Sequence, residues 1–494
     1  AAIALVIGVY LIATTVLIAK DGAFYIERAQ QLASDPVRII KAHPPGYPFL
    51  IMTAHKCAAL FTDDSSVYTW IYSAQSVTLL CRLLALIPLY LTGKLLVGGK
   101  NGFWALLILI FLPYPTRIVC DVVREWPYIL LLSTGFFLLL SASKRNKPWV
   151  FGLAGLASGI GYMIRPECVQ VVLYGIAWLL INMFWSTCKT GRVRLLLAMV
   201  LLMAGFLVPV VPYAKTRGEV LPSLLKKLIS RSSPEQPGEA TKAEVQTKVC
   251  AYYKADFFPG RILKGIGRLI NTVCESMMYV LVPFWMLGFC SYFKGKARDD
   301  PKKFYISLLV FCTCAVFVWV YHERGRNSDR HILPLIALTV FFVPIGFQIA
   351  AERLTKRSPS KHTVSLDVQN KRWFYTLLLV SIAIFLPKLT RPIRIEKKGY
   401  RNVSNWLKQN TKAEDVIAVF DFRISFYAER HGAKYRLNRV PEGVDYVVGK
   451  FKEGEEISPR PRRGTKIKSI YTHNLDRDDK KVVVYKVVPR KKRQ

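Results

Sequence analysis

Acidic residues are scarce in this sequence, and its cysteines do not form a metal-binding pattern. The 494 residues include 33 Asp and Glu against 70 Lys and Arg, which gives a formal net charge of +37. None of the 10 cysteines belongs to a Cys-x-x-Cys pair, and several lie in apolar runs, among them Cys81, Cys290, Cys312 and Cys314. Because neither zinc-finger spacing nor an aromatic RNA-binding motif accompanies the positive charge, we expect no nucleic-acid partner. The cysteines are expected to be small buried apolar residues.

Long uncharged runs are what the sequence has in abundance. Apolar and aromatic residues make up 52% of the chain, and Ala1 to Ala19 carries no charge. Such a run is long enough to cross a hydrocarbon core of about 30 Å. A signal peptide is the alternative for it, but it has neither a basic leader nor a small-residue cleavage site before Lys20. We therefore expect a polytopic α-helical membrane protein with about eleven transmembrane helices. The expected spans lie near 1–19, 72–91, 103–115, 126–143, 149–164, 168–186, 195–213, 275–293, 304–321, 331–351 and 373–387.

The positions of the short basic loops predict the orientation of these spans. When the sides alternate, five basic segments fall on one face, which the positive-inside rule makes cytoplasmic. The opposite, external face then receives the long loops 20–71 and 214–274 and the tail. The expected domains are a membrane part, 1–390, and a soluble external part, 391–494. The five basic segments are 94–100, 144–147, 189–194, 294–303 and 353–372.

The tail is predicted to be a small α/β domain. Helical spacing covers Arg401 to Asn410 and Arg423 to Arg430, whereas Asp415 to Asp421, Val444 to Val448 and Lys481 to Val488 are strand-like. Alternating helices and strands favour a compact sheet domain packed on the membrane part.

Asp21 is the first candidate functional residue, because it follows the first run directly. A carboxylate at the boundary between membrane and water is partly desolvated, which suits a general base. The alternative is a helix N-cap, since Asp before a helical stretch is a common start signal. The sequence leaves both interpretations open.

The same external loop contains His43-Pro-Pro-Gly-Tyr47-Pro. Its prolines fix the backbone and its glycine permits a sharp turn, so His43 and Tyr47 are candidates for the wall of a binding pocket. A stiff turn that leads into a helix is the alternative.

Further charges collect on the external side between later spans. Glu125 follows Asp121 and Arg124 beside a very apolar stretch, and Arg124 could pair with it. Arginines bind phosphate oxygens well in a dry pocket, although arginines that only snorkel at helix ends are the alternative. The candidate substrate-binding residues of this group are Glu125, Arg165, Glu167, Arg326, Arg330 and His331.

As a set, these motifs resemble a known family. They are the Asp-Gly-x-x-Tyr loop, the His-Pro-Pro-Gly-Tyr-Pro stretch, Glu125 in V-x-x-E-x-x-Y-x-L-L, the Arg-Pro-Glu, and Arg330-His331-Ile-Leu-Pro-Leu. The chain is similar to the GT-C glycosyltransferases, in the group of the dolichyl-phosphate-mannose protein mannosyltransferases and the bacterial aminoarabinose transferases. The tail resembles the external domain of some bacterial members, which favours a bacterial cell membrane.

The resemblance implies a polyprenyl-phosphate sugar as donor and a lipid, glycan or protein as acceptor. It places Asp21 at the reacting centre, either as the general base for the acceptor hydroxyl or as a ligand of a divalent cation such as Mg or Mn. No Asp-x-Asp metal motif of the kind that oligosaccharyltransferases use is recognised in the sequence, so the metal question stays open.

A transporter or lipid flippase is the alternative function, because many spans with internal charges also suit a substrate path. Large external loops, a folded tail and the lack of a recognisable repeat favour the transferase.

Overall fold

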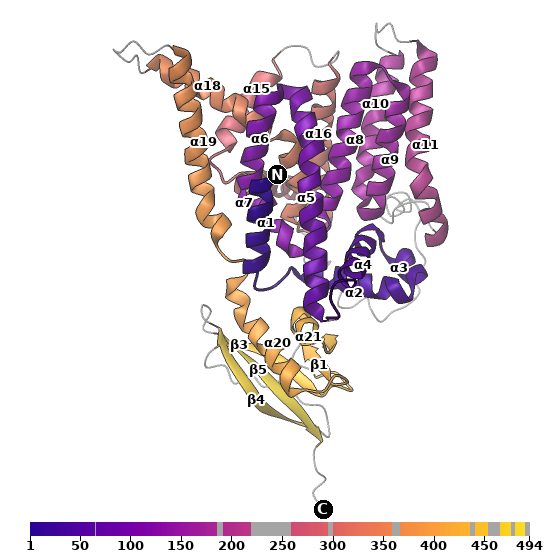
Figure 1. Cartoon of the computed structure of the whole chain (residues 1–494), viewed down its shortest axis with the longest axis vertical. Coiled ribbons are helices and arrows are strands. Elements are labelled where there is room, and N and C mark those ends of the chain that lie inside the picture. The colour runs from indigo at the N-terminus through magenta and orange to yellow at the C-terminus, as the bar shows by residue number, and fades with distance from the viewer. Residues whose placement is uncertain are drawn as a thin grey trace, which may run out of the picture.

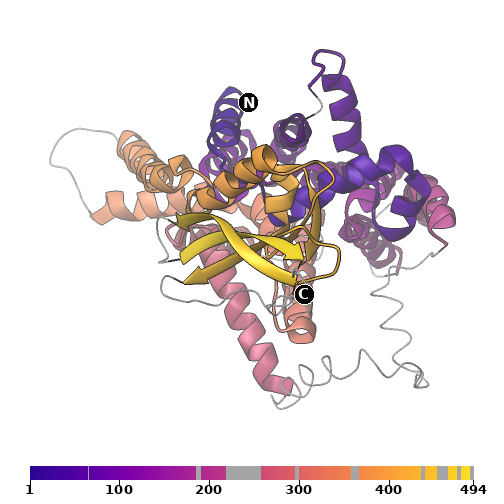
Figure 2. The ribbon, with the colours of Figure 1, turned by 90° about the horizontal axis from the view of Figure 1, so that it is seen from below.

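A bundle of long helices stands on a small sheet domain, which covers one end of it (Figures 1 and 2). The computed structural model describes residues 1–64, 66–184, 191–218, 258–294, 300–357, 366–434, 440–452, 465–475 and 480–489. The helices of the membrane part are α1 (Ala2–Thr14), α2 (Lys20–Ser34), α3 (Pro36–Ala42), α4 (Gly46–Ala58), α5 (Val67–Val97), α6 (Gly99–Phe111), α7 (Pro113–Arg117), η1 (Ile118–Asp121), α8 (Glu125–Arg145), α9 (Pro148–Ile164), η2 (Pro166–Val169), α10 (Gln170–Phe184), α11 (Arg192–Arg217), α14 (Phe258–Ser276), α15 (Val282–Tyr292), α16 (Pro301–Arg324), η4 (Asp329–Ile332), α17 (Leu333–Thr339), α18 (Phe342–Arg357) and α19 (Leu366–Thr390).

The expected number of about eleven spans is not confirmed. Among the described residues, 6 helices are long and apolar enough to cross a membrane, or up to 8 if each of two bent helix pairs is one span. The chain is nonetheless an integral multi-pass membrane protein by the length and composition of these helices.

Three of the expected apolar runs are broken or shortened, and proline explains one of the breaks. The run near 103–115 is divided between α6 and α7, which meet at a bend of 60°. Leu112 is extended there because the following Pro113 disfavours a helical conformation before it. The run near 331–351 is also bent, by 61°. In the first run, α1 ends at Thr14. The observed helix therefore covers only the first part of the helix expected over 1–19.

The segment after α1 is extended and is held by the tail. Arg401 and Arg423 donate hydrogen bonds to the carbonyl oxygens of Val16 and Ile18, at 3.0 and 3.1 Å. Ile18 N donates to the Tyr427 hydroxyl at 3.1 Å. Side chains of the tail thus satisfy backbone groups that a helix would otherwise pair, just before α2 begins.

The expected external loop 20–71 folds into helices α2, α3 and α4 and leads into α5. These helices lie at the same end of the bundle as the sheet domain (Figure 1). The other long loop, 214–274, lies largely outside the described residues. Its described C-terminal part belongs to α14, where Leu263 and Ile270 are exposed.

The tail forms a mixed sheet of five strands in the order β2-β1-β3-β5-β4. Strand β1 is parallel to β2 and β3, whereas β5 is antiparallel to β3 and β4. The two predicted helices and three predicted strands of this domain all have counterparts, and β2 and β4 were not predicted. The elements are η5 (Ile395–Lys397), α20 (Lys398–Asn410), β1 (Val416–Val419), α21 (Phe422–Ala428), β2 (His431–Lys434), β3 (Tyr446–Lys452), β4 (Thr465–Leu475) and β5 (Lys480–Pro489).

Candidate active site

An alternating chain of acids and bases lies where α2, α8 and η4 meet. Arg330 Nη2 of η4 donates to Asp21 Oδ2 in the first turn of α2 at 2.6 Å. Its other terminal nitrogen lies 3.7 Å from Glu125 Oε1 at the start of α8. The Asp21 side chain is 51% exposed and that of Glu125 only 6%. The cluster therefore has an open carboxylate at its edge and a buried carboxylate inside.

Arg165 extends this cluster toward α9 and η2. Its Nη1 lies 3.7 Å from Glu125 Oε1, and its Nε lies 3.1 Å from Glu167 Oε1. Its Nη2 is 2.8 Å from His331 Nδ1. Because a guanidinium can only donate, His331 Nδ1 is the acceptor of that hydrogen bond. The Tyr128 ring lies under the guanidinium, 5.0 Å away.

Two glycines permit the close packing that brings these side chains together. A Cβ on Gly22 would lie 2.5 Å from the carbonyl oxygen of Asp121, so α2 can approach η1 only because residue 22 has no side chain. A Cβ on Gly46 would lie 2.9 Å from the carbonyl oxygen of Met163, near the end of α9. The glycine beside Asp21 and the glycine of the proline-rich stretch thus set the distances within the site.

The turn between η1 and α8 is strained. Val122 is buried and has a φ of 54°, a left-handed conformation that a β-branched residue rarely adopts. Such a conformation costs on the order of 1–3 kcal/mol and persists only where the surroundings enforce it. Here it directs the chain from Asp121 into Glu125 at the first position of α8.

Six of the nine predicted site residues join one network: Asp21, Glu125, Arg165, Glu167, Arg330 and His331. Asp21 does not cap α2, since Ala19 is the N-cap and the Asp21 carboxylate binds Arg330. Arg124 donates to the Ile164 carbonyl oxygen at 3.4 Å, so the ion pairs of Glu125 run to Arg165 and Arg330 instead.

The other three predicted residues lie outside the network. Tyr47 is buried, with its hydroxyl 2.9 Å from Thr78 Oγ1, and has a packing role at the start of α4. His43 is half-buried before α4, and burial together with the charges of nearby arginines lowers its pKa. Arg326 is exposed, and among the described residues no hydrogen bond or ion pair joins it to the cluster.

Sequence analysis missed two tyrosines beside the cluster. Burial raises the pKa of Tyr25, the positive charge of Arg124 opposes that rise, and the Glu125 and Asp21 carboxylates add to it. Tyr25 is the last residue of the Asp-Gly-x-x-Tyr motif, and its position there was the available signal. Tyr114 Oη is buried and has no hydrogen-bond partner among the described residues. No sequence signal distinguishes Tyr114 from other tyrosines near a span end.

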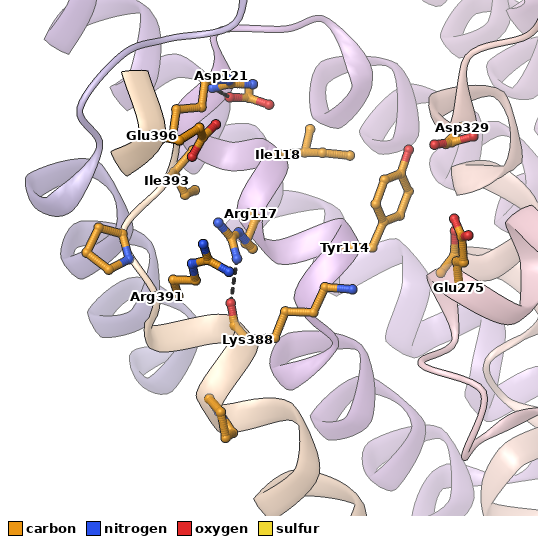
Figure 3. Close-up of a pocket in the computed structure, with 14 residues that line it drawn as sticks. Tyr114, Arg117, Ile118, Asp121, Glu275, Asp329, Lys388, Arg391, Ile393 and Glu396 are labelled. Carbon is orange, nitrogen blue, oxygen red and sulfur yellow. Dashed lines mark hydrogen bonds and ion pairs between the residues drawn. The ribbon is translucent and has the colours of Figure 1, made fainter. Parts of the chain in front are cut away.

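A cavity of about 730 Å³ opens beside the cluster, between α7, the end of α19 and the chain that follows it. Figure 3 shows Arg117, Lys388 and Arg391 on one side of it, with Asp121 and Glu396 near them, and Glu275 and Asp329 on the other. Asp329 precedes Arg330, which places the cavity next to the Asp21 cluster.

The described residues contain no group of three or more His, Cys, Asp or Glu side chains suited to hold a metal ion. Asp21 and Glu125 are both paired with arginine, whose charge disfavours a cation nearby. As placed in the described part of the chain, these two carboxylates therefore do not fit a Mg or Mn site. One Asp-x-Asp sequence, Asp476 to Asp478, occurs in the tail, outside the described residues.

Comparisons with known proteins agree on one kind of fold. Residues 42–213 match the family model of the dolichyl-phosphate-mannose-protein mannosyltransferases. No curated protein matches the chain by sequence.

Solved structures resemble nearly the whole chain. The Archaeoglobus fulgidus oligosaccharyltransferase in complex with Zn and sulfate has a TM-score of 0.56 at 12% identity, over 90% of this chain and 67% of that one. The same enzyme, AglB, in complex with an inhibitory peptide and a dolichol-phosphate gives 0.57 at 12% identity, over 90% and 69%. ArnT from Cupriavidus metallidurans in the apo state gives 0.54 at 11% identity, over 98% and 96%.

At these identities the structures show the fold alone, while the mannosyltransferase match covers Glu125 and Arg165 but neither Asp21 nor Arg330. Over residues 42–213 the chain is similar to the dolichyl-phosphate-mannose-protein mannosyltransferases, and its fold resembles that of AglB and ArnT.

Proposed function

We propose that the chain transfers a sugar from a polyprenyl-phosphate donor to an acceptor hydroxyl, with inversion at the anomeric carbon. The reaction takes place at the end of the bundle that carries α2–α4 and the tail, which is the external face. The observation that carries the proposal is the Asp21–Arg330 pair, an open carboxylate and a cation held at 2.6 Å beside a large cavity.

In this reaction Asp21 accepts the proton of the acceptor hydroxyl. The hydroxyl oxygen then forms a bond to the anomeric carbon as the bond from that carbon to the phosphate oxygen breaks. The electron pair of the broken bond leaves with the polyprenyl phosphate. Negative charge therefore moves from the Asp21 side to the departing phosphate, and a fixed cation stabilises it where it develops.

The geometry suits Asp21 better than Glu125 for the base. Glu125 lies between Arg165 and Arg330 and is nearly inaccessible, so it holds the two arginines in place. Asp21 meets solvent, so an acceptor hydroxyl can reach it while Arg330 holds the carboxylate in place. No step is assigned to a metal ion.

Structures of relatives supply support of a different kind. AglB, whose fold is similar, has been solved with a dolichol-phosphate and an inhibitory peptide. We infer that this chain also uses a lipid phosphate as the leaving group, with a lipid, glycan or protein as the acceptor.

The test is a transfer assay with the full chain in proteoliposomes. Radiolabelled polyprenyl-phosphate sugars are supplied with hydroxyl-bearing lipids, glycans and Ser/Thr peptides, and label in each fraction is followed. The proposal expects label to move to one acceptor class and the anomeric configuration of the product to be inverted relative to the donor. Intact donor that crosses the bilayer without being consumed would instead establish a flippase.

A further inference from the structure

The large cavity beside the active site has a basic wall that internal ion pairs do not neutralise. Other cations near the cavity are paired, Arg394 with Asp121 and Arg268 with Asp329. Arg117, Lys388 and Arg391 form no ion pair with any described residue. Glu396 lines the same wall but forms no ion pair with any of these three cations. Three positive charges at one wall of a cavity repel one another unless an anion lies between them.

Arg117 is held in position within this wall. It is partly buried and donates from Nη1 to the Lys388 carbonyl oxygen at 2.6 Å. Figure 3 shows its guanidinium beside that of Arg391, and the Arg391 charge acts on Arg117. Two guanidinium groups side by side present several N–H donors to one point, an arrangement that fits the oxygens of a phosphate.

Simple snorkelling does not account for these contacts. A snorkelling arginine extends toward the head groups and water and makes few protein contacts. Arg117 instead bonds across to the last helix of the bundle, and the two arginines come from α7 and from the chain just after α19. The pair is thus assembled from segments far apart in sequence.

The wall lies at the end of a lipid-facing helix surface. Large apolar side chains of α19 are exposed up to this point, among them Leu379, Ile384 and Leu386. The first charged residue after them is Lys388, which lines the cavity. A lipid tail along α19 would therefore bring its head group to the basic wall.

The far side of the cavity leads to the Asp21 cluster. Tyr114 lies between the basic wall and Asp329 in Figure 3, and its buried hydroxyl has no hydrogen-bond partner in the part of the chain that the structure describes. A polar group left unpaired in this position is available to a ligand. Asp329 is the neighbour in sequence of Arg330, which binds Asp21.

We propose that Arg117, Lys388 and Arg391 form the subsite for the phosphate of a membrane lipid. If the proposed function holds, that lipid is the polyprenyl-phosphate donor, and its sugar extends past Tyr114 toward Asp21. Arg330, already paired with Asp21, then orients the base and is not the principal phosphate ligand. This differs from the expectation that Arg165, Arg326 and Arg330 bind the phosphate.

Binding of sugar-free polyprenyl phosphate tests the subsite without requiring turnover. The full chain is reconstituted in nanodiscs of zwitterionic lipid, and the dissociation constant is measured for wild type, R117Q/R391Q, the single variant K388Q and R330A. The matched control is R372Q, an exposed arginine at the opposite end of α19. Unchanged size-exclusion profiles and melting temperatures establish that each variant is folded.

The expected result is at least about tenfold weaker binding in R117Q/R391Q, a smaller loss in K388Q, and little change in R330A or R372Q. Phosphatidic acid and inorganic phosphate serve as competitors. Preference for polyprenyl phosphate over phosphatidic acid identifies the donor lipid, and equal competition identifies a general phospholipid head group at the same subsite.

Wild-type affinity in R117Q/R391Q, or loss in R330A alone, would overturn the subsite while leaving sugar transfer at Asp21 intact. No binding of polyprenyl phosphate or phosphatidic acid by the wild type would also overturn it. The two proposals can fail separately: sugar transfer by the wild type together with wild-type lipid affinity in R117Q/R391Q would keep the proposed function and reject the subsite.

Discussion

Asp21 and Glu125 lie close to the same arginine but in different surroundings. Both approach Arg330, yet Asp21 is half exposed whereas Glu125 is enclosed by Arg165 and Arg330. When two carboxylates share a site, the environment of each decides its task. Exposure makes Asp21 the carboxylate that can meet an acceptor, and enclosure makes Glu125 the one that fixes the arginines.

Glu125→Gln is expected to lower stability as well as activity. The change leaves two guanidinium groups near an uncharged amide in a nearly buried position, and removing one partner of a buried ion pair typically costs about 3–5 kcal/mol. Thermal unfolding in detergent measures the effect as a lower melting temperature. Glu414→Gln, at an exposed position of the tail, is the matched control. An unchanged melting temperature for Glu125→Gln would contradict the bridging role of Glu125.

His43 predicts a pH dependence of stability. Its pKa in the folded chain is lowered, first by burial and then by Arg28, Arg217 and Arg124, from an ordinary value of about 6.5. The unfolded chain therefore binds the proton more readily, and the contribution of neutral His43, fully present above about pH 6.5, is lost as the pH falls through the folded pKa.

The measurement is the melting temperature of wild type and His43→Gln between pH 7.5 and 5, taken as a window around the ordinary pKa of about 6.5. The wild type should lose more stability on acidification than the variant. Parallel curves would count against a buried, neutral His43. His431→Gln, at an exposed histidine of the tail, controls for loss of an imidazole in general.

Sequence reasoning at the residue scale identified most charged members of the network but not their partners. Asp21 and Arg330 lie 309 positions apart, and nothing in either motif indicates that they touch. Arg326 lies in the same loop as Arg330, but it is exposed, and no contact among the described residues joins it to the cluster. Motifs select residue types, whereas the fold selects which of them meet.

At the scale of the elements, the apolar runs predicted membrane helices better than their boundaries. A hydropathy pattern cannot distinguish a straight helix from one broken at a proline, and the break at Leu112-Pro113 is what brings Tyr114 and Asp121 to the site. The tail strands β1, β3 and β5 were predicted because they are apolar. Strand β4 is exposed or half-buried at every position but its last. Its sequence therefore lacks the apolar run that predicted the other three strands.

Gly22→Ala tests how closely α2 must approach η1. The added methyl would meet backbone at 2.5 Å, which cannot be relieved by a side-chain rotation. Overpacking of this kind costs about 1–3 kcal/mol and displaces Asp21 from Arg330. We expect transfer activity to fall at least about tenfold, since small misplacements of a reacting group are costly.

Gly99→Ala is the matched control, because a Cβ there would find its nearest neighbour at 3.5 Å. The readout is kcat and melting temperature in the same preparations. Full activity in Gly22→Ala would show that the Asp21 geometry does not depend on this contact.

At the scale of the whole molecule, the tail and the membrane part form one structure around the segment before Asp21. Arg401 and Arg423 of the tail donate hydrogen bonds to the backbone carbonyl oxygens of Val16 and Ile18. Burial alone would raise the pKa of Asp421, but its hydrogen bonds and ion pair with Arg423 outweigh burial and lower it. The tail thus positions the start of α2 in addition to covering the end of the bundle.

Arg423→Gln is accordingly expected to reduce transfer several-fold and to lower the melting temperature, because the Ile18 carbonyl and the Asp421 carboxylate both lose a buried partner, at a cost of about 1–3 kcal/mol. Lys466→Gln, at an exposed position of β4, is the control. If Arg423→Gln destabilises the tail without changing kcat, the tail is a cover and does not position Asp21.

The central claim is that Asp21 acts as the base in sugar transfer from a polyprenyl phosphate. The most direct measurement compares turnover of a polyprenyl-phosphate sugar by wild type, Asp21→Asn and Asp63→Asn, an exposed carboxylate of the same external region. The account predicts that Asp21→Asn stays folded, binds the donor lipid and loses about 10²–10⁴-fold in kcat, while Asp63→Asn is unaffected. Wild-type turnover by a folded Asp21→Asn protein would contradict it.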